Sequence, residues 1–288
     1  MSRTRWIALT VRVPSEELAD ELAEGLVSLG GLAVEQGVDV LTTYVPEPAD
    51  PDAFLDTAAD RLTAIAGEAP ELLWRWQDDE DWSARWKEGL EPRRVGDRIV
   101  VTQPWNPVEP EGDDVVIVID PSSAFGTGEH PTTRGALRLL ERAVTGGERV
   151  LDVGAGSAIL GIAAVRLGAG SVLAVESDPG AIGTAAANIA RAGVGDRIEL
   201  VNAVVDAAYL DSVRERFDVI AANVLSGVLT PLLPGLRSAL RPAGRVILGG
   251  IMTDEAGGVR QAAAAAGLEA AAEDREGEWW TALLRAAP

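Results

Sequence analysis

The feature that most restricts the fold of this 288-residue chain is an alternation of strand and helix patterns that begins at Arg149. The pattern predicts strands at 149–153, 171–175, 198–201, 217–222 and 245–249, and helices at 158–167, 179–192 and 229–239. Such an alternation predicts a doubly wound, Rossmann-like sheet that is mostly parallel. Two more strand patterns, 268–274 and 279–284, flank a glycine-containing turn and predict an antiparallel hairpin at the edge of that sheet.

The first 76 residues have a different pattern, with strands and helices in the order β-α-β-β-α-β. This order predicts a small ferredoxin-like α+β domain. Residues 77–97 contain Trp82 and Trp86, four positions apart, and predict a linking helix whose tryptophans pack in a core or interdomain seam. The larger domain is expected at 98–288, where strand patterns at 98–102 and 115–119 precede the alternating region.

The composition excludes several classes of site. The chain has no cysteine, which excludes disulfides, zinc–thiolate sites, iron–sulfur clusters and cysteine nucleophiles. Lys87 is the only lysine and His130 the only histidine, so a Walker lysine, a Ser-His-Asp triad and a multi-histidine metal site are not expected. No metal is expected, and we interpret His130 as structural.

The formal net charge of −20 bears on partners. Such a surface repels nucleic acid and anionic membranes and attracts a basic protein. Alternatively, the acidity only keeps the chain soluble. No apolar stretch has the length of a membrane span, and the N-terminus lacks a signal-peptide core, so the default expectation is a cytoplasmic protein.

The strongest local motif is VLDVGAGSAILGIAA, residues 150–164, in which a strand ends at Asp152 and turns through Gly154 and Gly156 into a helix. Glycines there let the backbone approach a ligand closely, and a helix N-terminus favours polar or anionic groups. A dinucleotide fingerprint needs a third glycine where Ile159 stands. The loop therefore fits S-adenosylmethionine (AdoMet) better than NAD; the alternative is a plain turn without a ligand.

Two more strand ends carry polar side chains. Glu176 ends the next predicted strand, where a carboxylate accepts hydrogen bonds from both ribose hydroxyls of a nucleoside. Asp178 is the alternative carboxylate, although Ser-Asp-Pro also predicts a helix cap. Asn223 ends the fourth strand, where its carbonyl can hold an amine and aim the lone pair of that amine. The alternative for Asn223 is a helix cap.

The segment DPSSAFGTGEHPTTR, residues 120–134, precedes the first strand of the alternating region. It contains Phe125, Gly126, Gly128 and two adjacent threonines that open a helix. Loops of this composition are usually plain turns. Its hydroxyls and amides can equally close over the amino-acid end of AdoMet.

Four motifs together, AFGTGEHPTTR, VLDVGAGSAILGIAA, FDVIAANVLSG and PAGRVILGGI, resemble the PrmA-type methyltransferases of large-subunit ribosomal protein eleven. The resemblance spans nearly the whole chain and implies a seven-stranded AdoMet-dependent methyltransferase sheet. It implies an enzyme that methylates lysine side chains and the N-terminal amine of a basic ribosomal protein, which the N-terminal domain recognises. The sequence does not determine the oligomeric state, for which a monomer is the default expectation. Asn223 is the implied catalytic residue. The implied AdoMet contacts are Thr133, Gly154, Glu176 and Asn223, joined by Phe125, Gly126, Gly128 and Gly156.

The sequence departs from this family at a few positions. Ala155 and Ala158 replace the cysteine and the last glycine of the usual loop, Glu176 replaces an aspartate, and Ala243 replaces a glycine. Ala158 is expected to narrow the loop. Three alternatives stay open: a methyltransferase of nucleic-acid bases, a methyltransferase of another protein, and a non-catalytic AdoMet-binding module. Enzymes of the first kind commonly have Asn-Pro-Pro-aromatic where Val224 and Leu225 follow Asn223 here.

Overall fold

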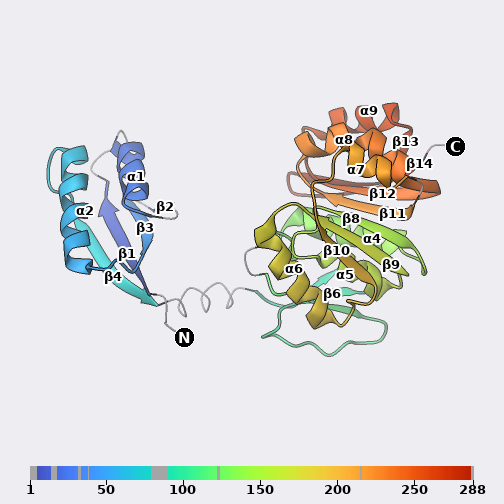
Figure 1. The fold of residues 1–288 in the computed structure, drawn as a ribbon, viewed down its shortest axis with the longest axis horizontal. Coiled ribbons are helices and arrows are strands. Elements are labelled where there is room, and N and C mark those ends of the chain that lie inside the picture. Colours follow the sequence, from blue (N-terminus) through green and yellow to red (C-terminus); the bar gives the residue numbers. More distant parts are fainter. Residues whose placement is uncertain are drawn as a thin grey trace. The chain divides into compact units, whose positions relative to one another are not determined.

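The computed structural model describes residues 5–13, 18–31, 34–37, 39–78, 90–121, 124–214 and 216–286. The chain divides into two compact units, Met1–Leu90 and Glu91–Pro288, and each is described by itself (Figure 1). No helix among the described residues is long and apolar enough to cross a membrane.

The N-terminal unit is a four-stranded antiparallel sheet that packs against two helices (Figure 1). Its elements are β1 (Arg5–Arg12), α1 (Ala19–Ser28), β2 (Val34–Gln36), β3 (Val40–Pro46), α2 (Pro51–Ala66) and β4 (Leu72–Asp78). The strand order is β2-β3-β1-β4. Alternation puts Ile7, Leu9 and Val11 of β1 on the helix side, where they form the core. The helix α2 begins where Asp50 accepts a hydrogen bond from Ala53 N at 3.1 Å.

The segment between the predicted domains is described only in part. Residues 79–89 lie outside the described residues, and with them Trp82, Trp86 and most of the predicted linking helix. A short strand that the sequence did not reveal, β5 (Arg93–Val95), follows this segment and belongs to the second unit. It pairs with β6 (Ile99–Thr102), which pairs with β7 (Val115–Val118), so the two predicted strands lie in a small separate sheet.

The second unit is built on a seven-stranded sheet with the order β10-β9-β8-β11-β12-β14-β13. Its strands are β8 (Arg149–Val153), β9 (Ser171–Glu176), β10 (Ile198–Asn202), β11 (Phe217–Asn223), β12 (Leu240–Met252), β13 (Leu268–Glu276) and β14 (Trp279–Ala286). The first five strands of this order are parallel, and β14 pairs antiparallel with both β12 and β13. The predicted mostly parallel sheet with an antiparallel C-terminal hairpin is confirmed.

Helices cover both faces of this sheet (Figure 1). One buried cluster joins the sheet to α4 (Pro131–Ala143), α5 (Ile159–Leu167) and α6 (Pro179–Ala192). The other joins it to α7 (Ala207–Ser212), α8 (Ser226–Ala239) and α9 (Ala256–Ala265). The two cores pack against the sheet from both sides.

Candidate functional site

Three neighbouring strands bring their last residues to one level at the carboxyl edge of the sheet. Val153 of β8 is in register with Val175 of β9 and with Ala222 of β11. The next residues along these strands are Gly154, Glu176 and Asn223. The predicted glycine loop, ribose carboxylate and amine-binding amide therefore lie side by side, at the edge where open parallel sheets bind ligands.

The glycine loop has a backbone that side chains do not fit. Gly154 has φ +67° and Gly156 has φ +53°. A Cβ on Gly156 would lie 2.5 Å from Phe125 O, and one on Gly154 would lie 2.6 Å from a methyl of Val224. Both glycines are therefore needed for close approach of neighbouring loops. Ala158 also has a left-handed backbone, φ +66°, which costs roughly 1–2 kcal/mol for an L residue other than glycine.

Ser157 joins the glycine loop to the segment that contains Phe125 and Gly126. Its backbone N–H donates to Phe125 O at 2.9 Å, and its hydroxyl donates to Gly126 O at 2.6 Å. Gly128 instead packs on β6, because a Cβ there would lie 2.8 Å from Val101. The 120–134 segment is thus more than a plain turn: its first half forms one side of the glycine loop.

Asn188 on α6 is a second joining residue that sequence reasoning missed. It is fully buried, and its Nδ2 donates to Asp120 O and to Ser157 O, each at 3.1 Å. Its Oδ1 accepts from Asp120 N at 2.9 Å. A polar residue on the buried face of an otherwise alanine-rich helix was the available signal, since buried amides are normally fully hydrogen-bonded.

Glu176 and Asp178 have different roles. The carboxylate of Glu176 is nearly buried and accepts from Gly156 N and from Asp178 N, each at 2.8 Å. Asp178 is exposed and caps α6 by accepting from Gly180 N at 2.8 Å. The cap predicted for Asp178 is confirmed. Glu176 is the carboxylate that contacts the glycine loop.

Asp152 is a buried carboxyl group directly beneath the loop. Its Oδ2 accepts from Gly161 N at 2.9 Å, and its Oδ1 has no partner among the described residues. Burial raises the pKa of Asp152 to about 7; the Gly161 hydrogen bond opposes this shift and the charge of Glu176 adds to it. Near neutral pH, this carboxyl group is therefore poised between its charged and neutral forms.

Besides Asp152 Oδ1, two more buried side-chain oxygens of this unit, both on predicted site residues, accept no hydrogen bond from the part of the chain that the structure describes. They are Oδ1 of Asn223 and Oγ1 of Thr133. The alternative role of Asn223 as a helix cap is wrong, because α8 starts after Leu225 and has no side-chain cap. Unpaired buried acceptors are uncommon in native proteins and often mark functional positions.

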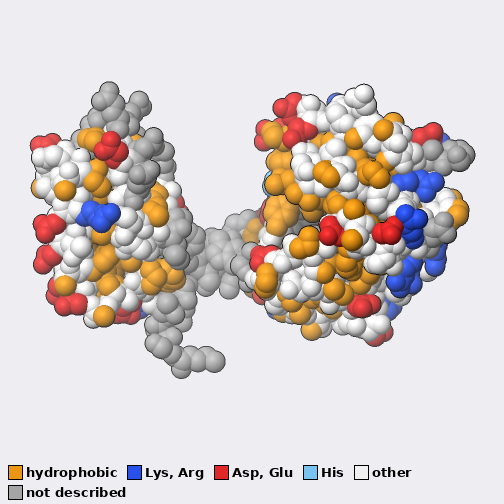
Figure 2. Space-filling model, turned by 45° about the horizontal axis from the view of Figure 1, so that its top comes forward, with side chains coloured by type: hydrophobic (Ala, Val, Ile, Leu, Met, Phe, Trp, Pro, Cys, Tyr) orange, Lys and Arg blue, Asp and Glu red, His pale blue; other side chains and the backbone are white. Residues whose placement is uncertain are grey.

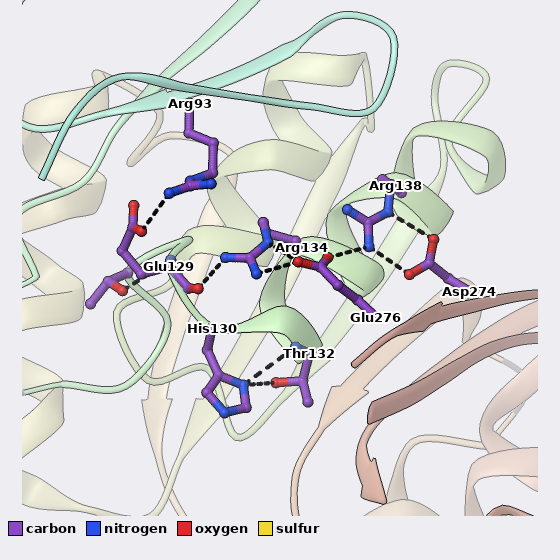
Figure 3. A network of polar contacts seen from close by, with 9 residues as sticks. Arg93, Glu129, His130, Thr132, Arg134, Arg138, Asp274 and Glu276 are labelled. Carbon is purple, nitrogen blue, oxygen red and sulfur yellow. Dashed lines mark hydrogen bonds and ion pairs between the residues drawn. The ribbon is translucent and has the colours of Figure 1, made fainter. Parts of the chain in front are cut away.

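His130 lies in a network that holds the start of α4 (Figure 3). Its Nδ1 lies 2.8 Å from Thr132 Oγ1 and accepts weakly from Thr132 N, so it caps the helix. Its ring packs edge-on between Phe125 and Trp279, with ring centroids 5.3 and 4.8 Å away. Burial, with a smaller contribution from Arg134, lowers the pKa of His130. These contacts agree with a structural role.

Arg134 connects this loop to the C-terminal hairpin (Figure 3). Its guanidinium donates to Glu129 O and to the carboxylate of Glu276 on β13. Arg138 binds the same carboxylate at 2.8 Å and Asp274 at 2.6 Å. The hydrogen bond from Arg134, ahead of the one from Arg138, lowers the pKa of Glu276 to about 2. The loop is thus anchored by a carboxylate that stays charged.

The structure places the sequence-predicted site residues in one region. Gly154, Gly156, Phe125, Gly126, Glu176 and Asn223 lie in or beside the glycine loop, Thr133 is buried in α4, and Gly128 packs against β6. Among the described residues, no cluster of side chains has the composition of a metal site.

Comparisons with known proteins identify the family. The family model for ribosomal protein L11 methyltransferase (PrmA) matches residues 8–286. A ribosomal protein L11 methyltransferase of Pelobacter propionicus is 37% identical over 310 residues, which covers 99% of this chain and 98% of that protein. One from Chloroflexus aurantiacus is 35% identical over 328 residues and covers 100% of both chains.

A solved structure agrees with these relatives. The ribosomal protein L11 methylase from Lactobacillus delbrueckii subsp. bulgaricus has a TM-score of 0.62 and 33% identity, and the match covers 69% of this chain and 100% of that one. The chain therefore belongs to the ribosomal protein L11 methyltransferase (PrmA) family of AdoMet-dependent protein methyltransferases.

Proposed function

We propose that this chain transfers methyl groups from AdoMet to lysine side-chain and N-terminal amines of ribosomal protein L11, at the carboxyl edge of the seven-stranded sheet. The observation that carries the proposal is the buried Oδ1 of Asn223, which lies at the end of β11 next to the glycine loop and has no hydrogen-bond partner within the described part of the chain. An acceptor in this position is suited to hold the N–H groups of an amine.

The residues at this edge fit AdoMet. Each oxygen of Glu176 accepts one backbone N–H and keeps a lone pair for a ribose hydroxyl. Gly154 and Gly156 leave the loop backbone free of side chains, and Thr133 offers a buried hydroxyl without a partner among the described residues. Phe125, Gly126 and Gly128 complete the proposed set of contacts. When bound, AdoMet supplies an electrophilic methyl group on its sulfonium.

The chemistry left to the protein is orientation and removal of water. A lysine amine has an ordinary pKa of about 10.4 and must lose a proton before it can act as a nucleophile. His130 does not serve as the base in this proposal, because its Nδ1 is engaged with Thr132 and burial lowers its pKa. Asn223 orients the amine, and the proton passes to water.

We assign substrate recognition to the N-terminal unit, as the sequence predicted. All strand ends that form the proposed site belong to the second unit. The order β2-β3-β1-β4 supports a ferredoxin-like module without a glycine loop. A basic ribosomal protein as the partner fits the acidic composition and the cytoplasmic location expected from the sequence. A monomeric state stays a prediction.

Two kinds of variant test this function. Asn223→Ala should lower the single-turnover rate of methyl transfer to ribosomal protein L11 by about a hundredfold, which corresponds to about 2.7 kcal/mol in the transition state, with little change in AdoMet affinity. Glu176→Ala should instead weaken AdoMet binding by roughly tenfold to a hundredfold, the cost of hydrogen bonds to a charged group. Asn223→Asp keeps the acceptor and adds charge, so it separates hydrogen bonding from size. A parental rate in Asn223→Ala would show that another group holds the amine.

A further inference from the structure

The second unit exposes its large hydrophobic side chains at one edge only. Within the described residues, every such side chain lies at the last residue of β12 or in a segment that follows β7, β10 or β11, at or beside the carboxyl edge of the sheet. They are Phe125, Val204, Leu225, Val228 and Met252. Figure 2 shows hydrophobic side chains gathered on the side of this unit that lies away from the C-terminus.

Three of these side chains, Leu225, Val228 and Met252, form a group beside Asn223 that we call the apolar collar. Leu225 is 69% exposed, Val228 56% and Met252 36%. Their two segments are in contact, because a Cβ on Gly250 would collide with Val224 O. Ser226 Oγ also donates to Glu255 at 2.7 Å, and Glu255 in turn accepts from Met252 N at 3.0 Å. The segments that carry Leu225 and Met252 therefore lie together, and Val228 follows in the first turn of α8.

The surroundings of the collar are acidic. The loops at the carboxyl edge, 154–158, 176–178, 203–206, 224–225, 253–255 and 277–278, contain no Lys or Arg. They contain the carboxylates of Glu176, Asp178, Asp206, Asp254, Glu255 and Glu278. Arginines of the neighbouring elements are engaged: Arg134 pairs with Glu276, and Arg260 and Arg275 pair with Glu273.

The cationic side chains of this unit gather at the opposite edge. Arg149 begins β8, Arg197 and Arg216 precede β10 and β11, and Arg285 lies near the end of the antiparallel strand β14. Figure 2 shows Lys and Arg side chains collected on the side near the C-terminus. A cationic partner is therefore attracted to the carboxyl edge and repelled by the amino edge.

We propose that the apolar collar binds the polypeptide segment that carries the target amine, and that it favours apolar residues beside a cationic one. This inference rests on the proposed function, because the amine must reach Asn223. Leu225 and Val228 follow Asn223 within five positions, and Met252 is the last residue of β12, the strand that pairs with β11. The residues next to a methylated amine therefore meet the collar, while the acidic loops complement the positive charge of that segment.

The test uses the full chain and two fluorescein-labelled peptides, each with a central lysine, one with leucine neighbours and one with serine neighbours. Leu225→Ser and Val228→Ser should each weaken binding of the leucine peptide by about tenfold, measured by fluorescence anisotropy, because each removes partly buried apolar contact. The serine peptide and AdoMet should bind with parental affinity. Val204→Ser, which changes a valine of the second unit that lies outside the collar and is 68% exposed, is the matched control and should change neither peptide.

Several results would overturn the proposal. Equal binding of both peptides to the parent, or no binding of either, removes the apolar preference. A change confined to AdoMet affinity means that the cofactor covers the collar, and a lower melting temperature without weaker peptide binding means that another part of the chain covers it. Failure of the proposed function is a separate outcome, in which the parent transfers no methyl group to ribosomal protein L11.

Discussion

Asp152 allows a quantitative test of the environment beneath the glycine loop. Its Oδ2 accepts from Gly161 N at 2.9 Å, and burial raises its pKa from 3.8 to about 7. Asp152→Asn keeps the shape of the side chain and an acceptor for Gly161, but removes the titration. The comparison of parent and variant across pH therefore isolates the carboxyl group.

The sign follows from proton binding. The folded state holds the proton of Asp152 more tightly than the unfolded state, so the stability that the neutral carboxyl contributes is fully present below pH 3.8 and is lost as the pH rises through 7. The complete shift corresponds to about 4 kcal/mol, at about 1.4 kcal/mol per pKa unit, and about 2 kcal/mol of it falls between pH 5 and 7. The variant should gain that much stability relative to the parent over this range.

Urea unfolding of both proteins at intervals from pH 5 to pH 8 gives the difference in unfolding free energy. A difference in unfolding free energy that does not change with pH is compatible with this reasoning, because the Asn amide also needs a hydrogen-bond partner at the position of Oδ1. Asp206→Asn, which changes an exposed carboxylate that caps α7, controls for loss of one surface charge. A variant-minus-parent difference that stays flat from pH 5 to pH 8 would refute the reasoning.

Further predictions concern the loop, the units and the hairpin. Gly156→Ala should lower the free energy of unfolding in urea clearly more than Gly193→Ala. Both glycines have φ near +60°, but only at Gly156 would an added Cβ lie 2.5 Å from a backbone oxygen. Equal losses in the two variants would exclude this close contact. The fragment Glu91–Pro288 should bind AdoMet in calorimetry yet lose methylation of ribosomal protein L11, and a full-length rate would remove the recognition role of the other unit. Glu276→Gln should weaken AdoMet binding by about threefold or more, because it loosens the loop that Arg134 anchors. Glu273→Gln, on the same strand, should leave AdoMet affinity unchanged. Parental affinity in both variants would show that the hairpin does not support the loop.

Elements with strong local signals were predictable from the sequence. The helix α6 spans the predicted residues, because Asp178 caps it, Pro179 opens it and Gly193 ends it with φ +63°. The six-residue α7 and the three-residue β5 were missed, since both are too short to show a period. The helix α8 starts three residues before the predicted position, at Ser226.

Some features of the candidate site were likewise predictable from the sequence, and others were not. Strand ends such as Glu176 and Asn223 were predictable, because parallel strands bring their carboxyl ends to one edge whatever the loops do. The hydrogen bonds from Ser157 to Phe125 and Gly126 and from Asn188 to Asp120 were not, since they join residues 31 to 68 positions apart. Contacts of this kind depend on how complete elements pack, and no local pattern records them.

The opposite placement of acidic and basic side chains gives the second unit a lengthwise electric dipole. A cationic protein that diffuses toward it experiences a torque before any contact forms, and is turned so that its positive segment leads toward the strand ends. The effect reaches about 8 Å beyond the surface at physiological ionic strength and shrinks as salt is added. We therefore expect arginines at the amino edge, such as Arg197, to influence how fast a cationic substrate arrives in the correct orientation without direct contact.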